Sequence, residues 1–391
     1  MKRTAGRLVH CTTSPEHFSA FVPAPLPPEP PLVISPDIQE LLEQANRALG
    51  RLDGIGALLP DTQLFLYSYI RKEALLSSQI EGTQSSFSDL LLYESKEAPG
   101  VPLDDVQEVS SYVAALEHGL QRIREGFPLS LRLIREVHEI LLSHGRGSHQ
   151  SPGEFRRSQN WIGGSRPGNA RYVPPPPDLV IDCLGALEKF LHDDPAPTPT
   201  LIKAALAHVQ FESIHPFLDG NGRVGRLLVT LLLCAEGAMT EPLLYLSLYL
   251  KQRRETYYDL LQQVRETGDW EAWLVFFLQG VQETAEQGAA TTRTLLQLFR
   301  EDRARIEGLG RSAASALRVF SEFQAAPILS VTKIAGTLGL SIPTVNTAVK
   351  NLEELGIVQE LTGRRRGRLF VYRRYLDVLS EGTEPIINSS N

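Results

Sequence analysis

Residues 200–232, TLIKAALAHVQFESIHPFLDGNGRVGRLLVTLL, contain two apolar segments separated by a short polar one. The first segment, Thr200 to Ile214, has apolar residues at helical spacing, and Pro216 disfavours helix at the residue before it. The second segment has the same period, so a helix is expected to begin near Gly222. This stretch therefore predicts two helices joined by a loop, with His215 at the end of the first helix.

The loop between these helices has the composition of an anion-binding site. A helix N-terminus presents unpaired N–H groups and a partial positive charge, and glycines let the backbone approach an anion closely. Arg223 and Arg226, three residues apart on the second helix, add fork-shaped donors that suit phosphate oxygens. Asp219 is placed to hold a magnesium ion that bridges those oxygens. The loop is thus expected to bind a magnesium polyphosphate.

His215 would stand at the edge of that polyphosphate as the group in the loop able to accept a proton near pH 7. A base beside an activated phosphate indicates nucleotidyl or phosphoryl transfer. Each residue alone also fits an ordinary structural role: Asp219 or Asn221 as a helix cap, His215 as a helix-end residue, and the arginines as surface residues. It is their combination that favours a binding site.

Three other motifs fit this stretch poorly. GNGRVG has the spacing GxGxxG, but the residues before it have a helical period, whereas a dinucleotide fold needs a strand there. An EF-hand loop counted from Asp219 would place Val224 and Thr230 where glycine and glutamate are required. A P-loop lacks its Lys-Ser/Thr pair after the second glycine.

HPFLDGNGRVGR, residues 215–226, fills every position of HxFx[DE]GNGRxxR, and at these residues the chain resembles the Fic family. The resemblance covers roughly residues 35 to 285. It implies an all-α core with a β-hairpin flap, and an adenylyltransferase that moves AMP from ATP to a hydroxyl group of a target protein. The target is unknown, self-modification is expected, and homodimers are common in the family. Another nucleotide or phosphocholine is the alternative transferred group.

The resemblance also implies roles for the residues of the signature. His215 would be the base, Asp219 the Mg²⁺ ligand, and Arg226 the anchor of the terminal phosphate of ATP. The phosphate cradle would consist of four consecutive residues: Gly220, Asn221, Gly222 and Arg223.

Residues 156–177 contain two short β-prone runs, Asn160 to Ile162 and Arg171 to Val173, separated by glycine and proline turn signals. They predict a lone β-hairpin on a helical body. By resemblance, this flap would align the target through strand addition beside the histidine. The residues expected to do so are Asn160, Trp161, Ile162, Tyr172 and Val173. A plain surface hairpin is the alternative.

YSYIRKEALLSSQIEG, residues 67–82, reads as a helix stopped at Gly82, with Glu81 in its last turn. A negative charge there opposes the helix dipole. SSQIEG resembles the inhibitory motif [ST]xxxE[GN] of Fic proteins, in which the glutamate pairs with the last arginine of the signature, here Arg226. Glu81 is therefore expected to act as a brake, with Ser77 or Ser78 docking the helix. The same glutamate could instead activate water to remove AMP from a modified protein.

The C-terminal part has a different character. Residues 331–358 predict two short helices with a turn at Gly339, and Ile357 to Leu361 and Leu369 to Tyr372 read as strands, which together indicate a winged helix-turn-helix. Polar positions of its second helix and arginines of its wing are candidates for DNA contact: Thr344, Lys350, Arg364, Arg365 and Arg366. A DNA-binding regulator that uses the Fic core as a nucleotide sensor is therefore a rival function, and protein docking is the alternative role of this module.

The whole chain has 391 residues, a net charge of -7 and three cysteines without a CxxC pair. This composition argues against generalised membrane or nucleic-acid binding, and a reducing, cytoplasmic location is expected because no signal segment or membrane span is apparent. The expected organisation is an extended, proline-rich lead-in at 1–34, an N-terminal helical region at 35–124, a catalytic core at 125–285, a linker helix at 286–310 and the winged helix at 311–391.

Overall fold

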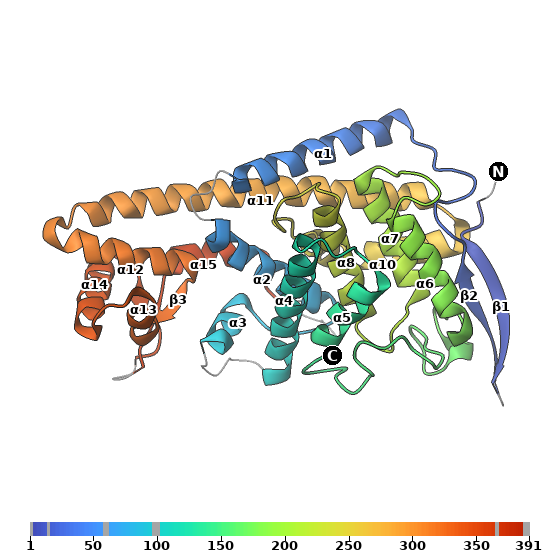
Figure 1. The fold of residues 1–391 in the computed structure, drawn as a ribbon, viewed down its shortest axis with the longest axis horizontal. Helices are drawn as coiled ribbons and strands as arrows, with labels where there is room; N and C mark the ends of the chain where they lie inside the picture. The colour runs from blue at the N-terminus through green and yellow to red at the C-terminus, as the bar shows by residue number, and fades with distance from the viewer. Residues whose placement is uncertain (1–2, 14–15, 58–61, 96–101, 364–366, 386–391) are drawn as a thin grey trace.

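The computed structural model describes residues 3–13, 16–57, 62–95, 102–363 and 367–385. Helices dominate, which confirms the predicted all-α core (Figure 1). The helices predicted from apolar spacing are present, with ends shifted by only a few residues. They are α1 (Pro36–Ala57), α2 (Thr62–Ile80), α4 (Leu103–Arg124), α5 (Leu131–Leu141), α6 (Pro177–Leu191), α7 (Thr200–Ile214) and α8 (Asn221–Ala235).

The centre of the molecule is the helix pair predicted from residues 200–232. Nearly every side chain of α7 and α8 is buried, including polar ones, because neighbouring helices cover them on all sides. Helices α2, α4 and α5 pack on α8, and α6 and α10 (Arg254–Thr267) pack on α7. Farther out, α3 (Phe87–Glu94) packs on α4, and α9 (Ser247–Gln252) packs on α2. The loop between α7 and α8 thus starts and ends on buried helices.

Helix α11 (Trp270–Glu307) is longer than the sequence pattern indicated. A helix ending near Glu283 and a separate linker helix at 286–310 were expected, but α11 continues through both. Its first half runs along α1, where Gly288 lies against the side chain of Leu52, and its second half keeps an apolar face on which Phe299 contacts Phe320 and Tyr375. Figure 1 shows α1 and α11 side by side along one edge of the molecule.

The extended lead-in expected for residues 1–34 is wrong for residues 6–23. These form an antiparallel hairpin of β1 (Gly6–Thr13) and β2 (Glu16–Pro23), whose register pairs Gly6 with Pro23 and Thr13 with Glu16. Alternate residues of β2 are buried because one face of the hairpin packs on the helical body: Phe18, Ala20 and Val22. The proline-rich residues that follow form no regular element.

The flap is less regular than the predicted hairpin. Its two runs meet in one antiparallel bridge between Ile162 and Tyr172, and a short 3₁₀ turn, η1 (Pro167–Asn169), lies between them. Pairing extends no further because Gly163 and Gly164 turn the chain away with positive φ angles of 70° and 72°. The backbone carbonyl of Val173 instead accepts a hydrogen bond of 2.8 Å from the N–H of Phe21 in β2.

The winged helix-turn-helix is present at the far end of the molecule from the β1–β2 hairpin (Figure 1). A second 3₁₀ turn, η2 (Gly310–Ser312), leads into it. Helices α13 (Val331–Leu338) and α14 (Ile342–Glu354) flank the predicted turn at Gly339, which has a left-handed backbone. The predicted strands are shorter than expected, and a third strand joins them in the order β3 (Ile328–Ser330), β5 (Leu369–Val371), β4 (Gln359–Glu360). Helices α12 (Ala313–Ala325) and α15 (Arg373–Ser380) complete it.

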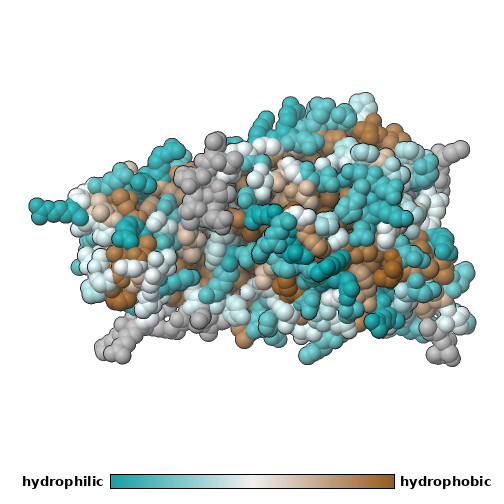
Figure 2. All heavy atoms as spheres, viewed as in Figure 1, coloured by the Kyte–Doolittle hydropathy of each residue, from teal (hydrophilic) through white to brown (hydrophobic). Residues whose placement is uncertain are grey.

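One hydrophobic cluster runs without a break from the N-terminal hairpin to α15. The domain boundaries at 124, 285 and 310 therefore remain predictions. On the outside, Figure 2 shows hydrophilic side chains interspersed with small apolar areas over the whole visible face. Within the described ranges, no helix is both long and apolar enough to cross a bilayer.

Candidate active site

His215 occupies the C-terminal cap of α7 in a left-handed conformation, with φ 48° and ψ 60°. This backbone region is unfavourable for a residue with a side chain, so its neighbours must hold it there. The buried guanidinium of Arg156 does so, because its Nε donates to the His215 carbonyl over 2.9 Å. The amide of Asn160, in the flap, donates to the carbonyl of Phe217 over 2.8 Å. The flap and the loop are therefore tied together beside the histidine.

The imidazole of His215 is neutral at physiological pH. Burial, reinforced by the positive charges of Arg265 and Arg156, lowers its pKa to about 3. Its buried Nδ1 has no hydrogen-bond partner among the described residues. A neutral ring with a free nitrogen can take a proton, but a pKa of about 3 makes it a weaker base than the histidine titrating near pH 7 that the sequence predicted.

The loop from Phe217 to Asn221 is closed by a side chain rather than by backbone bonds. The Asn221 amide accepts from the N–H of Phe217 and donates to its carbonyl, each over 2.8 Å. Gly220 then precedes α8 with a φ of 78°. The side chain of Asn221 is thus engaged with the loop, so any phosphate contact by this residue would fall to its backbone N–H.

Asp219 is half-exposed and lines a cavity of about 320 Å³ above the N-terminus of α8. Its Oδ1 accepts from the N–H of Gly220 over 2.6 Å, and its backbone carbonyl contacts the ring of His138. Magnesium is usually held by one or two carboxylates together with substrate phosphates. Asp219 fits that pattern. Among the described residues no group of three or more metal-binding side chains occurs.

Arg223 and Arg226 leave the same turn of α8 in different directions. Arg223 is buried, and its Nη1 donates over 3.3 Å to the carboxylate of Glu108, which is also buried. Arg226 points toward the end of α2, where it meets two residues. Its Nε donates to the Ser77 hydroxyl over 2.9 Å, and its Nη2 donates to the Ser77 carbonyl and to Oε1 of Glu81.

The predicted contact between Glu81 and Arg226 is therefore present, at 2.7 Å. Burial opposes ionisation of Glu81, but the positive charges of Arg226 and Arg223 outweigh it, and the net effect lowers the carboxyl pKa. The carboxylate lies on the N-terminal turn of α8, where a Cβ on Gly222 would stand 2.4 Å from its Oε1. Ser77 docks the helix. The hydroxyl of Ser78 is buried without a partner in the described structure.

A second cavity, of about 560 Å³, opens on the other side of Glu81. Glu81, His215 and Gly222 line both cavities. The second one is rich in aromatic and basic groups from α10 and the flap, including Trp161, Tyr172, Tyr257, Tyr258 and Arg254. A buried acid, Glu212, also faces it, and burial raises the pKa of this carboxyl to about 7. One cavity is thus polar and the other aromatic, with the histidine between them.

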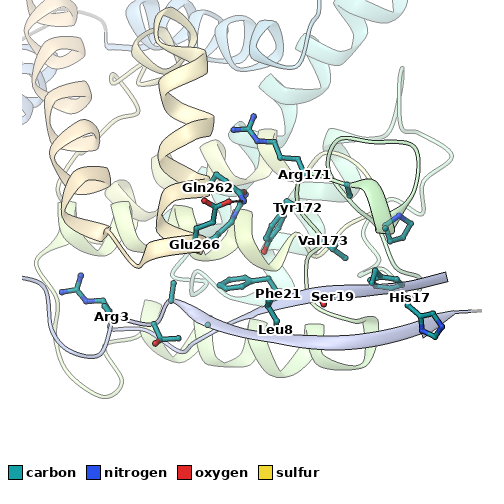
Figure 3. A pocket seen from close by; sticks show the side chains of 18 residues that line it. Arg3, Leu8, His17, Ser19, Phe21, Arg171, Tyr172, Val173, Gln262 and Glu266 are labelled. Atoms are coloured by element: carbon teal, nitrogen blue, oxygen red, sulfur yellow. Dashed lines mark hydrogen bonds between the residues drawn. The ribbon is translucent and has the colours of Figure 1, made fainter. Parts of the chain in front are cut away.

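A third cavity, of about 770 Å³, adjoins the aromatic cavity and lies between the β1–β2 hairpin, the flap and α10. Figure 3 shows Phe21 of β2 and Tyr172 of the flap beside each other in it, with Gln262 and Glu266 of α10 to the left of Tyr172. The guanidinium of Arg265 stacks on Tyr172 at 3.9 Å from the ring centroid. The cavity beside His215 and the cavity beside the hairpin are therefore neighbours that share Tyr172 and Arg265.

The flap residues chosen from the sequence have different surroundings. Trp161, Ile162 and Tyr172 line the aromatic cavity. Asn160 holds the loop, and Val173 is buried against β2.

The candidate DNA-contacting residues lie far from this site, in the winged helix. Thr344 and Lys350 are on α14, where Lys350 is exposed and pairs with Glu354 at 3.7 Å. Arg364, Arg365 and Arg366 lie outside the described residues.

Sequence reasoning missed several residues of the site. Glu108, Arg146, Arg156 and Arg265 are brought to it by helices or loops distant in the chain, and no local spacing marks them. Glu212 carried a signal, because a carboxylate is unusual in a helix whose residues are mostly apolar and buried on all sides.

Comparisons with known protein families agree with this geometry. Residues 128–233 match the model of the Fic/DOC family. The chain contains a Fic domain. Residues 39–121 match the N-terminal domain of the same family, so the Fic domain is preceded by the region that carries α2 and Glu81. Residues 314–359 match a winged helix-turn-helix described as DNA-binding.

Individual proteins that the chain resembles also carry the name Fic. The chain is 31% identical over 256 residues to a protein adenylyltransferase Fic from Aedes aegypti. This match covers 63% of the chain and 46% of the relative. A protein of the same name from Drosophila yakuba is 30% identical over 189 residues, and this match covers 48% of the chain and 35% of the relative. The chain thus spans between about a third and a half of these relatives.

A solved structure of a Fic family protein from Desulfovibrio desulfuricans shares the fold. Its TM-score is 0.58 at 21% identity, and the match covers 88% of this chain and 97% of that one.

Proposed function

We propose that the protein is an adenylyltransferase that moves AMP from ATP to a Ser, Thr or Tyr hydroxyl of a target protein or of itself. One observation carries this proposal. The neutral His215 and the N-terminal turn of α8 line the same two cavities, so a base stands beside a site suited to phosphates. The relatives named protein adenylyltransferase support the reaction class.

The reaction follows from this arrangement. Nδ1 or Nε2 of His215 takes the proton of the target hydroxyl as its oxygen attacks the α-phosphorus of ATP. The bond from the α-phosphorus to the bridging oxygen breaks, and pyrophosphate leaves. The N–H groups of Gly222 and Arg223, with the guanidinium of Arg226, would stabilise the charge on the phosphates. The aromatic cavity would receive the nucleoside, and the flap residues Trp161 and Ile162 would border the target.

Magnesium fits the residues present. Asp219 would hold it together with the phosphates, and the ion would neutralise charge that develops on the leaving pyrophosphate. The chain's own contribution is to orient this carboxylate, which it does through the N–H of Gly220.

We further propose that Glu81 keeps the enzyme inactive. Its carboxylate occupies the N-terminal turn of α8 and the guanidinium of Arg226, the two groups expected to bind the terminal phosphates of ATP. Arg226 is 2% exposed and Glu81 is 30% exposed, so this pair is better shielded from water than a surface salt bridge, and a phosphate that binds Arg226 would have to displace it.

The test is intact-mass analysis after incubation with ATP and magnesium. We expect little added mass on the native protein, an added AMP on Glu81→Gly, and none on Glu81→Gly with His215→Ala. GTP, CTP, UTP and CDP-choline serve as alternative donors in parallel. If Glu81→Gly gains no mass with any donor, group transfer to itself is excluded and the proposal depends on an added target. If it gains mass no faster than the native protein, the brake is wrong.

Removal of AMP is a second candidate, because Glu81 and His215 line both cavities together and a carboxylate there could activate water. Incubating the AMP-modified Glu81→Gly protein with the native one separates the two directions. Release of AMP that depends on Glu81 of the added protein would favour hydrolysis.

DNA binding is a third candidate, supported by the match of residues 314–359 to a DNA-binding winged helix. A salt-dependent mobility shift of random duplex DNA tests it. We expect the shift to disappear when Arg364, Arg365, Arg366 and Arg368 are replaced by alanine. Equal binding by the variant would mean that the wing does not contact DNA.

A further inference from the structure

The cavity above the N-terminus of α8 is lined by the signature loop, by Glu81 and by one residue from elsewhere in the described chain, Arg146. Arg146 lies in the loop after α5, and its side chain is 53% exposed. Arg146 lies outside the signature and far from it in the chain, so no sequence motif marks it.

The loop is shaped to present this arginine. Gly145 and Gly147, on either side of it, both have positive φ angles, 75° and 85°. A Cβ on Gly145 would stand 2.9 Å from the side chain of Glu108, and one on Gly147 would stand 2.4 Å from Oδ2 of Asp219. The loop therefore packs directly on the candidate metal ligand and on the carboxylate that holds Arg223.

The contacts of Arg146 are weak ones. Its Nη2 donates to the carbonyl of Glu81 over 3.2 Å and to the Glu108 carboxylate over 3.4 Å. Glu108 is shared with Arg223, whose own bond to it is 3.3 Å. A half-exposed guanidinium with two long hydrogen bonds can exchange them for an anion at small cost, whereas the buried Arg223 cannot move as freely.

We propose that Arg146 is a third arginine of the phosphate site and that it contacts a β- or γ-phosphate oxygen of the bound nucleoside triphosphate. This inference rests on the proposed function. It predicts a nucleotide dependence that a structural role would not produce, because a residue at the phosphate end affects ATP and ADP but leaves AMP binding unchanged.

Calorimetric titration with ATP, ADP and AMP tests the proposal. The background is Glu81→Gly with His215→Ala, which frees the site and prevents turnover. Adding Arg146→Ala should weaken ATP binding by about tenfold or more, as expected for loss of a hydrogen bond between charged groups. Arg146→Lys should recover part of the affinity. Arg132→Ala is the matched control, since Arg132 is 74% exposed on α5 and pairs with Glu136 on its own helix.

The outcomes separate the two proposals. If the background protein binds no ATP, the proposed function fails. If it binds ATP and Arg146→Ala binds ATP equally well, or loses ATP and AMP binding alike, the role of Arg146 is wrong.

A second inference comes from the other end of the chain. The segment after α15, residues 381–385, lies on the last turn of α2, immediately before Glu81. Gln79 is 1% exposed, and its amide donates to the carbonyls of Ser85 and Thr383, each over 2.8 Å. Thr383 is buried as well.

Other contacts fix the same segment. Lys251 of α9 donates to the carbonyls of Gly382 and Glu384. Gly382 has a φ of 77°, and a Cβ there would stand 2.9 Å from Leu248. Higher on α2, the hydroxyls of Ser68 and Tyr375 lie 2.9 Å apart in a buried position. The C-terminal segment thus joins the winged helix to α2 on the side opposite Arg226.

We infer that this segment is a clamp that holds the last turn of α2 in the inhibitory position. Any movement of that turn that withdraws Glu81 from Arg226 would have to break the buried bonds of Gln79. The inference depends on the proposed brake. It gives the winged helix a physical connection to the active site.

Self-labelling rates with ATP and magnesium test the clamp. Gln79→Leu and Lys251→Met should each raise the rate several-fold when Glu81 is present, and neither should raise it further in Glu81→Gly. Gln39→Leu is the matched control, because its exposed amide bonds only to Glu43 on the same helix. If Glu81→Gly is fast and neither clamp variant exceeds the native rate, the clamp is wrong. If Glu81→Gly itself labels slowly, the proposed brake is wrong, and the clamp, which depends on it, is wrong as well.

Discussion

Oε1 of Glu81 and Nη2 of Arg226 are 2.7 Å apart although 145 residues separate them in the chain. Arg226 lies in α8, Glu81 directly follows the last residue of α2, and Gly222 leaves the space that the carboxylate needs. Breaking such a pair by removing one partner leaves a buried charge, at a cost of about 3 to 5 kcal/mol. An anion bound in place of the Glu81 carboxylate would again pair with the buried charge of Arg226.

The two serines before Glu81 differ in their contacts, and this difference predicts different effects. Ser77→Ala removes the hydroxyl acceptor of Arg226 Nε and should lower the free energy of unfolding by about 1 to 3 kcal/mol. It should also raise self-labelling several-fold. Ser78→Ala is the control, since its buried hydroxyl has no partner among the described residues and its loss should neither lower stability nor raise self-labelling. Chemical denaturation and labelling rates measure both, and equal behaviour of the two variants would contradict the docking role of Ser77.

Glu212 predicts an unusual pH dependence of stability. Its pKa in the folded protein is raised to about 7 by burial, above that of an exposed carboxyl, so the folded state binds more protons than the unfolded one between these values. Stability from this group is therefore present at acid pH and lost as the pH rises to 7.

Glu212→Gln removes this dependence. We expect the variant to be more stable than the native protein at pH 8, by up to about 3 kcal/mol, and no more stable at pH 4.5. Denaturant unfolding at the two pH values checks the sign. A gain of equal size at both would show that Glu212 does not titrate in this range.

Asp219→Asn keeps the hydrogen bond to Gly220 and removes the charge that the metal requires. In the Glu81→Gly background we expect the rate of AMP transfer to fall by about 100-fold or more, because the metal contributes several kcal/mol to such reactions. ATP binding without magnesium should be unaffected. A variant whose magnesium dependence matches that of its parent would remove Asp219 from the metal site.

Alanine substitutions at Gly147 and Gly54 are expected to change stability in opposite directions. A Cβ on Gly147 would meet the carboxylate of Asp219, and its φ of 85° disfavours any side chain, so Gly147→Ala should reduce AMP transfer and stability together. Gly54 lies within α1 with nothing near its Cβ position. Gly54→Ala should raise stability by about 0.5 to 1 kcal/mol and leave transfer unchanged. Melting temperature and labelling rate decide both cases.

Local pattern was enough to predict the helices and the loop from His215 to Arg226. The reason is physical: the groups of that loop are neighbours in sequence, and a helix period and a helix start bring them to one point. Local pattern did not lead to the N-terminal hairpin. The hairpin at 6–23 went unpredicted because proline in the following residues drew the interpretation toward a tether, although Phe18, Ala20 and Val22 alternate as a half-buried strand does.

What the sequence by itself determined about this protein is therefore the helix pair α7 and α8 and the loop between them that begins at His215. Tertiary structure decided the rest: that Arg226 is bound to Ser77 and Glu81, that Glu108 holds Arg223, and that Arg146 lies over the same cavity. These contacts join helices and loops that are far apart in the chain. They exist because packing around α7 and α8 fixes distances that no local spacing records.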